Sequence, residues 1–235
     1  MGIKDREIYI RKDLFTDVFI GTNRFKFTEE LTPFNKRYLE VLLQEAFLSY
    51  QYQSDGDIDS NVFPFIVKGL IIDESKDILY LVDEFDKRKV TIPGGHISSY
   101  RMDEFSRDIE LIEFNLIREL CEEFKIGRNT NPYEEFNVPP IKEILMRGGF
   151  RMLHMGDLLY TLNDNLGLTI YIPIYVKNGI YPDNAIPVFI NEYKDIVKSG
   201  KRGRLERYCE YKNDIRINDC SHILDNIVNT EQLFK

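Results

Sequence analysis

Dense runs of apolar residues alternate with short polar segments through the middle of the chain. Residues 62–72 (VFPFIVKGLII) and 78–85 (ILYLVDEF) are rich in β-branched and aromatic residues, and the polar segment DESKD separates them. Two such runs with a short polar link predict a β-hairpin. The further strand-like segments are KVTIPGGHI (89–97), IKEILM (141–146), LLYTL (158–162), TIYIPIYV (169–176) and IPVF (186–189).

Helical spacing of apolar residues appears in two stretches. In residues 32–51 (TPFNKRYLEVLLQEAFLSYQ), we place Thr32 as the N-cap and Pro33 at the first helical position. Residues 109–124 (IELIEFNLIRELCEEF) carry an apolar stripe at the same period, which predicts a helix packed on a sheet.

Strands before and after a central helix predict an α/β (α+β) fold with a mixed sheet. The N-terminal segment EIYIRKDLF alternates like a strand, whereas the tail segments RLERYCEYK and SHILDNIVNTEQLF are typical of helices. We interpret the polar segment QSDGDIDSN (53–61) as the boundary between an N-terminal extension, residues 1–60, and a main domain, residues 61–235.

Composition narrows the function classes. Hydrophobic residues make up 43% and charged residues 30%, as in ordinary globular proteins. The net charge of −8 argues against general, phosphate-driven nucleic-acid binding. The three cysteines form no CxxC pair, and the charged N-terminus is unlike a secretory signal. Because no apolar run approaches the roughly 20 residues of a membrane span, we expect a cytoplasmic protein without a membrane segment.

The helix predicted over residues 109–124 gathers three like charges on one side. Glu119, Glu122 and Glu123 fall within an arc of about 100°, beside the apolar stripe. Two charges about 6 Å apart repel by roughly 3 kcal/mol at an effective dielectric of 20. A hard cation such as Mg²⁺ or Mn²⁺ would remove that cost. The alternative is a solvated acidic face, where each pair costs only a few tenths of a kcal/mol.

The surrounding motif is similar to that of a known family. Glu110, seven further residues and then Arg118–Ile126 (RELCEEFKI) follow the pair of glycines in Pro93–His96 (PGGH). This pattern resembles the Nudix box of the MutT-like hydrolases, and its GGHI wording is most similar to a branch of predicted phosphoesterases. The resemblance implies a Nudix-type α/β/α sandwich that hydrolyses a nucleoside diphosphate linked to another group, a small-molecule substrate, through Mg²⁺ or Mn²⁺.

The resemblance also implies roles for individual residues. Metal ligands would be Glu122 and Glu123, with Glu119 as a third ligand or an orienter of the attacking water. Arg118 would hold a glutamate in place through a charge-assisted bond. Glu110 would contact the metal-binding residues rather than the metal itself. The residues expected to contact substrate or complete the metal shell are Gly94, Gly95 and His96. Some relatives add a carboxylate from a later loop, for which the candidates are Asp183, Glu192 and Asp164.

The chain departs from the family pattern in two places. Fourteen residues (96 to 109) separate Gly95 from Glu110, where the family usually has five, so we expect residues 98–107 to form an inserted loop near the site entrance. Glu104 within this insertion competes with Glu110 for its place in the motif. The late glycine of the box, which eases the exit from the helix, is Lys125 here.

Other segments allow two interpretations each. The sequence RGGFR (147–151) would form a turn or bulge or would cradle an anion, and the basic segment KSGKRGR (198–204) would contact phosphates or be solvated. Residues 1–60 would form a lid or a homodimer contact. Two alternatives to the enzyme remain: a non-catalytic Nudix-fold module that binds a nucleotide or a protein, and an interaction domain with an acidic helix.

Overall fold

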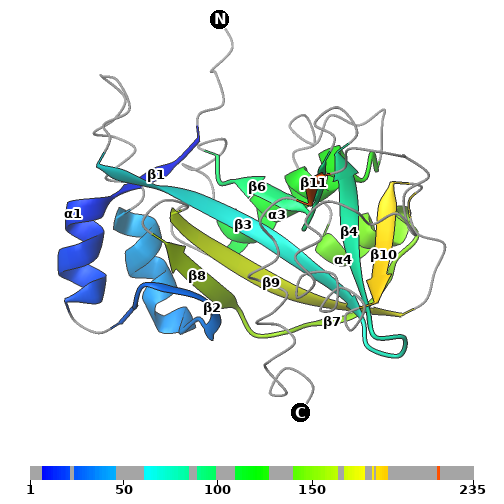
Figure 1. Ribbon diagram of the computed structural model, residues 1–235, viewed down its shortest axis with the longest axis horizontal. Helices are drawn as coiled ribbons and strands as arrows, with labels where there is room; N and C mark the ends of the chain where they lie inside the picture. The colour runs from blue at the N-terminus through cyan, green and yellow to red at the C-terminus, as the bar shows by residue number, and fades with distance from the viewer. Residues whose placement is uncertain are drawn as a thin grey trace, which may run out of the picture. The chain divides into compact units, whose positions relative to one another are not determined.

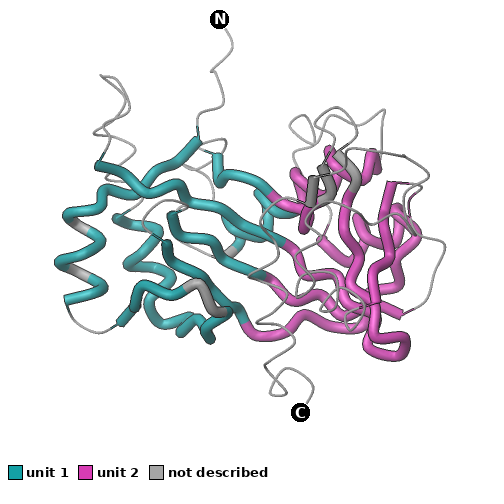
Figure 2. Tube along the Cα trace, viewed as in Figure 1, with its two compact units in different colours: residues 1–68, 95–116, 158–171 teal, residues 69–94, 117–157, 172–235 magenta. Residues whose placement is uncertain are grey.

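The computed structural model describes part of the 235-residue chain. The described residues are 7–21, 24–45, 61–84, 89–98, 109–126, 140–163, 167–177, 182, 184–189 and 216–217. The chain divides into two compact units, which are described separately (Figure 2). Unit 1 contains residues 1–68, 95–116 and 158–171, and unit 2 contains residues 69–94, 117–157 and 172–235.

Unit 1 contains the N-terminal elements and parts of longer strands (Figure 1). Its short elements are β1 (Tyr9–Arg11), α1 (Lys12–Phe15), the π-helix η1 (Thr16–Ile20), β2 (Thr28–Pro33), the 3₁₀ helix η2 (Lys36–Tyr38) and β8 (Leu159–Asn163). It also holds the beginnings of β3 (Val62–Asp73), α3 (Ile109–Glu123) and β9 (Gly167–Lys177). Antiparallel pairs join β1 to β3, β2 to β8 and β8 to β9. An aromatic cluster fills the core, in which the ring of Phe25 lies 4.9 Å from that of Tyr160 and 5.4 Å from that of Phe15.

The helix expected from Thr32 begins later than predicted. Thr32 and Pro33 belong to β2, where they pair with Tyr160 and Leu159 of β8. Asn35 is the N-cap instead, because its side chain accepts a hydrogen bond from the backbone N–H of Arg37. Residues 39–45 then continue as an α-helix. Pairing with a neighbouring strand therefore outweighs the local capping signal, and proline is tolerated because β2 pairs with one described strand only.

Unit 2 is built around a strand with neighbours on both sides. The neighbours of β4 (Ile78–Glu84) are the end of β3, β5 (Lys89–Thr91) and β10 (Ala185–Phe189). Val82 pairs with both Ala185 and Thr91, so β10 and β5 lie on opposite sides of β4. The two residues of β11 (Arg216–Ile217) pair with β5 in parallel, whereas β7 (Arg151–Met155) pairs with the end of β9 antiparallel.

The predicted hairpin is confirmed. β3 and β4 pair antiparallel on either side of residues 74–77. The buried carboxylate of Asp73 accepts hydrogen bonds from the backbone N–H and the hydroxyl of Ser75, at 3.1 and 2.6 Å. Asp77 completes the turn with φ 55°, in the left-handed region that aspartate tolerates better than most residues.

The segment IKEILM was predicted as a strand, which is wrong. It forms the helix α4 (Ile141–Arg147), and its buried side chains are Ile141, Ile144 and Leu145. Their spacing of three and four residues fits a helix, and so short an apolar run does not separate the two possibilities by itself. The following RGGFR forms the helix end and the start of β7, which confirms the turn interpretation.

The α+β class with mixed strand pairing is confirmed. In the described ranges, no helix has the length and apolar character needed to span a membrane. The tail helices, residues 99–107 of the expected insertion and most of the boundary segment 53–61 lie outside the described residues, so the division at residue 60 stays a prediction.

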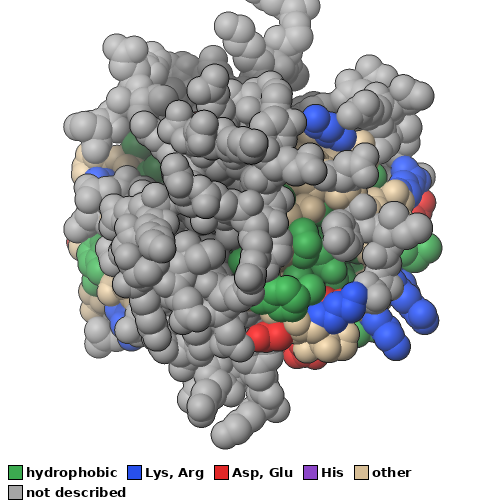
Figure 3. Space-filling view, turned by 45° about the vertical axis from the view of Figure 1, so that its right-hand side comes forward, with side chains coloured by type: hydrophobic (Ala, Val, Ile, Leu, Met, Phe, Trp, Pro, Cys, Tyr) green, Lys and Arg blue, Asp and Glu red, His purple; other side chains and the backbone are tan. Residues whose placement is uncertain are grey.

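One face of the molecule shows hydrophobic and basic side chains next to each other (Figure 3). Exposed large apolar side chains in unit 2 include Met146, Leu153 and Phe189.

Candidate functional site

The apolar stripe of α3 is buried as its spacing predicts. Of its six apolar residues, which begin at Ile109, the five whose burial is described are all buried: Ile112, Leu116, Ile117, Leu120 and Phe124. In unit 2 the ring of Phe124 packs edge-on against that of Phe150, with centroids 5.6 Å apart. This burial fixes the rotation of the helix, so that the glutamates stand at the border of its buried face.

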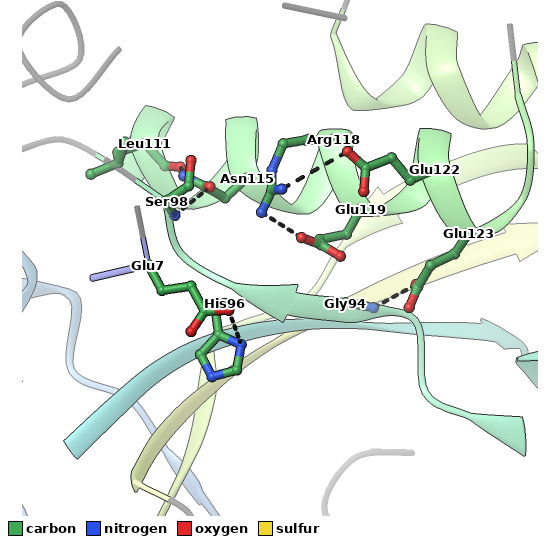
Figure 4. Close-up of polar contacts among 10 residues, drawn as sticks. All are labelled: Glu7, Gly94, His96, Ser98, Leu111, Asn115, Arg118, Glu119, Glu122 and Glu123. Atoms are coloured by element: carbon green, nitrogen blue, oxygen red, sulfur yellow. Dashed lines mark hydrogen bonds and ion pairs between the residues drawn. The ribbon is translucent and has the colours of Figure 1, made fainter. Parts of the chain in front are cut away.

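Arg118 contacts two of the three glutamates. Its guanidinium forms an ion pair with the Glu119 carboxylate, and these side chains are only 11% and 13% exposed. A second guanidinium nitrogen lies 3.9 Å from the Glu122 carboxylate, whose side chain is 48% exposed (Figure 4). The cation therefore offsets part of the repulsion expected among the glutamates, and it holds Glu119 where water has little access.

Glu123 connects the helix to the glycine pair. Its carboxylate accepts a hydrogen bond of 2.8 Å from the backbone N–H of Gly94, at the start of β6 (Gly94–His96; Figure 4). Gly94 has φ 138°, a conformation that favours glycine. The preceding residue is held as well, since the carbonyl of Pro93 accepts from the N–H of Gly69 at 2.8 Å. The two parts of the motif thus meet at one charge-assisted hydrogen bond.

The C-terminal end of α3 has a specific backbone geometry. Lys125, at the position of the family's glycine, has φ 55°. The N–H of Ile126 donates to the carbonyl of Cys121 at 3.0 Å, and that of Lys125 donates to Glu122 at 3.3 Å. These two bonds form a Schellman motif, whose left-handed position usually holds glycine. The role given to that position from the sequence, an exit from the helix, agrees with this geometry.

Helix α4 ends in the same motif. Gly149 takes the left-handed position with φ 87°, and the N–H of Phe150 donates to the carbonyl of Leu145 at 2.8 Å. The two helix ends are packed together, because a Cβ added to Gly148 would lie 2.5 Å from Cδ1 of Ile126. The close packing of Gly148 on Ile126 therefore helps to fix the point at which the chain leaves the glutamate-bearing helix.

The other predicted residues are distributed as follows. Gly95 and His96 follow Gly94 on β6 and belong to unit 1, where His96 Nδ1 lies 3.5 Å from the carboxylate of Glu7. Glu110 is exposed in the first turn of α3. The residues Asp164, Asp183, Glu192 and Glu104, and the basic segment 198–204, lie outside the described residues.

The donor chemistry of the glutamates suits a hard cation, since carboxylate oxygens are preferred ligands of Mg²⁺ and Mn²⁺. The positions of these glutamates fit a metal site less well than their donor chemistry does. Within the described ranges, no group of three or more His, Cys, Asp or Glu side chains converges as metal ligands would. Glu119 and Glu122 face Arg118, and Glu123 faces the Gly94 amide. Their assignment as metal ligands stays a prediction.

Two asparagines near α3 were not identified from the sequence. Asn115 is fully buried on α3; it accepts from the backbone N–H of Ser98 at 2.9 Å and donates to the carbonyl of Leu111 at 2.8 Å. Asn184 donates from its side chain to the carbonyl of Glu123. A signal for Asn115 was present, because a polar residue between the apolar Phe114 and Leu116 needs internal hydrogen bonds when buried.

Comparisons with known proteins assign no family to the chain. No family model and no curated protein sequence matches the chain. Among solved structures, the chain is similar to the crystal structure of Tm1382, "a putative Nudix hydrolase", with a TM-score of 0.37 and 10% sequence identity. The likeness covers 82% of this chain and 90% of that one. Likeness of this degree assigns no function to the chain.

Proposed function

We propose that the protein is a metal-dependent Nudix-type hydrolase that cleaves a nucleoside diphosphate linked to another group. The observation that carries the proposal is the hydrogen bond between the Glu123 carboxylate and the Gly94 amide. It brings Gly94 and the glutamate-bearing end of α3 together within unit 2, despite the expected insertion between them in the sequence. The motif was recognised from residue types alone, so this contact supports it independently.

Each residue would have a distinct role. Glu119, Glu122 and Glu123 would hold Mg²⁺ or Mn²⁺, which would supply charge neutralisation of the phosphate oxygens and an activated water. Arg118 orients Glu119 and Glu122 through its ion pairs. The Gly94 amide holds the Glu123 carboxylate at the end of the helix. Gly95 and His96 would contact substrate.

The second candidate is a Nudix-fold module that binds a nucleotide or a protein partner without hydrolysis. It is favoured by the ion pairs that engage Glu119 and Glu122 with Arg118, and by the lack of three converging ligands among the described side chains. In that case the glutamates would be satisfied by protein groups, and a divalent cation would add nothing to stability.

One variant separates the two candidates. Replacing Glu122 and Glu123 by Gln preserves size and helix propensity but removes two negative charges. In the wild type, Mg²⁺ at ten times its dissociation constant should stabilise the fold by about 1.4 kcal/mol. The double variant should lose this stabilisation together with Mg²⁺-dependent hydrolysis of nucleoside diphosphate derivatives.

The measurements are melting curves with and without Mg²⁺ and a product-release assay over a panel of nucleotides. The matched control, Glu40→Gln with Glu45→Gln, removes the same charge from the helix at residues 39–45 and should retain both properties. Equal hydrolysis by the wild type and the Glu122/Glu123 variant would disprove the metal-ligand assignment. Nucleotide-induced stabilisation without turnover in the wild type would favour the binding module.

A further inference from the structure

The last carbonyl of α3 takes its hydrogen bond from a distant part of the chain. The last four carbonyls of an α-helix have no partner within the helix. Three of those in α3 accept from N–H groups of residues 124–126, where the chain leaves the helix: the carbonyls of Leu120, Cys121 and Glu122. The carbonyl of Glu123 accepts from the side-chain amide of Asn184, which lies 61 residues further along the chain.

Glu123 is thereby held at both of its ends. Its carboxylate accepts a hydrogen bond from the N–H of Gly94 at 2.8 Å (Figure 4), and its carbonyl accepts from Asn184. All three residues belong to unit 2. A donor suits the carbonyl well, because the C-terminal end of a helix carries a partial negative charge. The torsions of the Glu123 side chain lie between two fixed points, so its carboxylate is held in one orientation.

The strands of unit 2 carry both anchors of Glu123. On β4, Val82 pairs with Thr91 of β5 on one side and with Ala185 of β10 on the other. Gly94 comes three residues after Thr91, and Asn184 comes directly before Ala185. Strand pairing with β4 therefore helps to place the two donors, in addition to their bonds to Glu123.

The turn before β10 fixes the backbone of Asn184 without calling for asparagine. The N–H of Ala185 closes this turn by donating to the carbonyl of Pro182 at 2.9 Å. Asn184 is not among the described residues with positive φ, the region in which asparagine is favoured. Its side chain does supply two N–H donors, and a carbonyl can only accept. Replacement of Asn184 therefore tests the side-chain hydrogen bond rather than the turn.

We propose that Asn184 is a positioning residue for Glu123: by holding the last carbonyl of α3, it keeps the Glu123 carboxylate in the orientation in which it would bind the cation. The part that concerns the cation rests on the proposed function. Without Asn184, the last turn of α3 loses one of its two anchors, and the carboxylate samples other rotamers. A carboxylate that must first be ordered binds a cation more weakly, because the ordering lowers the affinity.

The orientation of Glu123 is measured first, without metal or substrate. Three-bond NMR couplings across its Cα–Cβ bond should show a single staggered rotamer in the wild type. Asn184→Ala should give averaged couplings, and Asn184→Gln, which keeps an amide donor on a longer side chain, should retain part of the preference. The matched control Val188→Ala removes buried atoms from the same strand but keeps the bond to Glu123, so its couplings should equal those of the wild type.

Urea denaturation of each variant shows that it is folded before the couplings are compared. A role confined to stability would lower the denaturation midpoint of Asn184→Ala and leave the rotamer of Glu123 unchanged. Unchanged couplings in Asn184→Ala, or averaged couplings already in the wild type, therefore overturn the positioning role.

Titration calorimetry with Mg²⁺ is the second measurement. Asn184→Ala should weaken Mg²⁺ binding by about tenfold to a hundredfold, the usual effect of removing a group that orients a metal ligand. Asn184→Gln should be intermediate, and Val188→Ala should bind as the wild type does. Hydrolysis by Asn184→Ala should fall at limiting Mg²⁺ and recover as Mg²⁺ is raised. Equal Mg²⁺ affinity in Asn184→Ala and the wild type overturns the role toward the cation. A wild type that binds no Mg²⁺ overturns the proposed function, while the couplings still decide whether Asn184 positions Glu123.

Discussion

The residue that ends α3 offers a quantitative test of the backbone geometry. Lys125 has φ 55° and occupies the left-handed position of a Schellman motif. Replacing Lys125 by glycine should remove the steric cost of a Cβ in this conformation. Replacement by alanine keeps that cost. Both substitutions remove the lysine charge near the end of the helix, so the difference between the two variants isolates the backbone term.

The size of the effect follows from two opposing contributions. A residue with a Cβ is destabilised by about 1–2 kcal/mol in the left-handed region. Glycine avoids this cost but lowers the stability of the fold by about 0.4–1 kcal/mol, because the unfolded chain with glycine is more flexible. The glycine variant should therefore be more stable than the alanine variant by about 0.8 kcal/mol. For a protein of this length, that difference raises Tm by about 2 °C.

Urea denaturation of both variants measures the difference directly, provided that the slope of the transition is the same in each. Gly149→Ala is the reciprocal control: its φ of 87° should make the alanine variant less stable than the wild type. An alanine variant at Lys125 that is as stable as the glycine variant would refute the left-handed geometry at the end of α3.

Three other substitutions test the packing, the buried polar network and the phenols. Gly148→Ala should destabilise the protein by about 1–3 kcal/mol through overpacking, because the new Cβ meets Ile126 Cδ1 at 2.5 Å. Adding Ile126→Val removes that atom and should restore part of the lost stability, as measured by urea denaturation. No recovery of stability in the double variant would contradict the contact. Asn115→Ala should cost about 1–3 kcal/mol, because the N–H of Ser98 loses its acceptor in a buried site; a thermal melt equal to the wild type would contradict this. Burial raises the pKa of Tyr175, and the nearby carboxylates of Glu74 and Asp157 raise it further. Tyr175 therefore ionises at a lower pH in the unfolded chain than in the folded protein, and the free energy of unfolding should fall as pH rises above about 10. Tyr175→Phe should weaken this fall in alkaline denaturation, and a pH profile identical to that of the wild type would contradict the prediction.

The sequence was most informative where local signals and tertiary pairing agree. The hairpin of β3 and β4 was predicted because two β-rich runs flank a polar turn, and Asp73 then caps that turn with its own side chain. The stripe of α3 was predicted because six apolar residues, from Ile109 to Phe124, share one helical face. Helix α4 was missed because IKEILM is too short for its period to be decisive, and Thr32 was misplaced because pairing with β8 is not visible locally.

The candidate site was predictable in its residue types but not in its contacts. The sequence identified Arg118 and the three glutamates, yet it did not indicate that Glu123 would bind a main-chain amide, since an amide N–H is present at nearly every position. Glu7 could not be connected with His96, because nearly 90 residues separate them and main-chain pairing of the two segments, which includes the bridge between Glu7 and Ser98, is not visible in the sequence. The lysine at position 125 looked like a loss from the motif, whereas its backbone adopts the glycine-like conformation.

The hydrogen bond between Glu123 and Gly94 also provides a way to detect ligand binding at the candidate site. Any ligand that takes over the Glu123 carboxylate must compete with the Gly94 N–H, which would then turn to solvent or to the ligand. Side-chain substitutions other than proline leave this donor in place, so its state is read best by spectroscopy of the main chain. The amide resonance of Gly94 and its hydrogen-exchange rate should therefore change as a cation such as Mg²⁺ is added and binds Glu123, without any substrate.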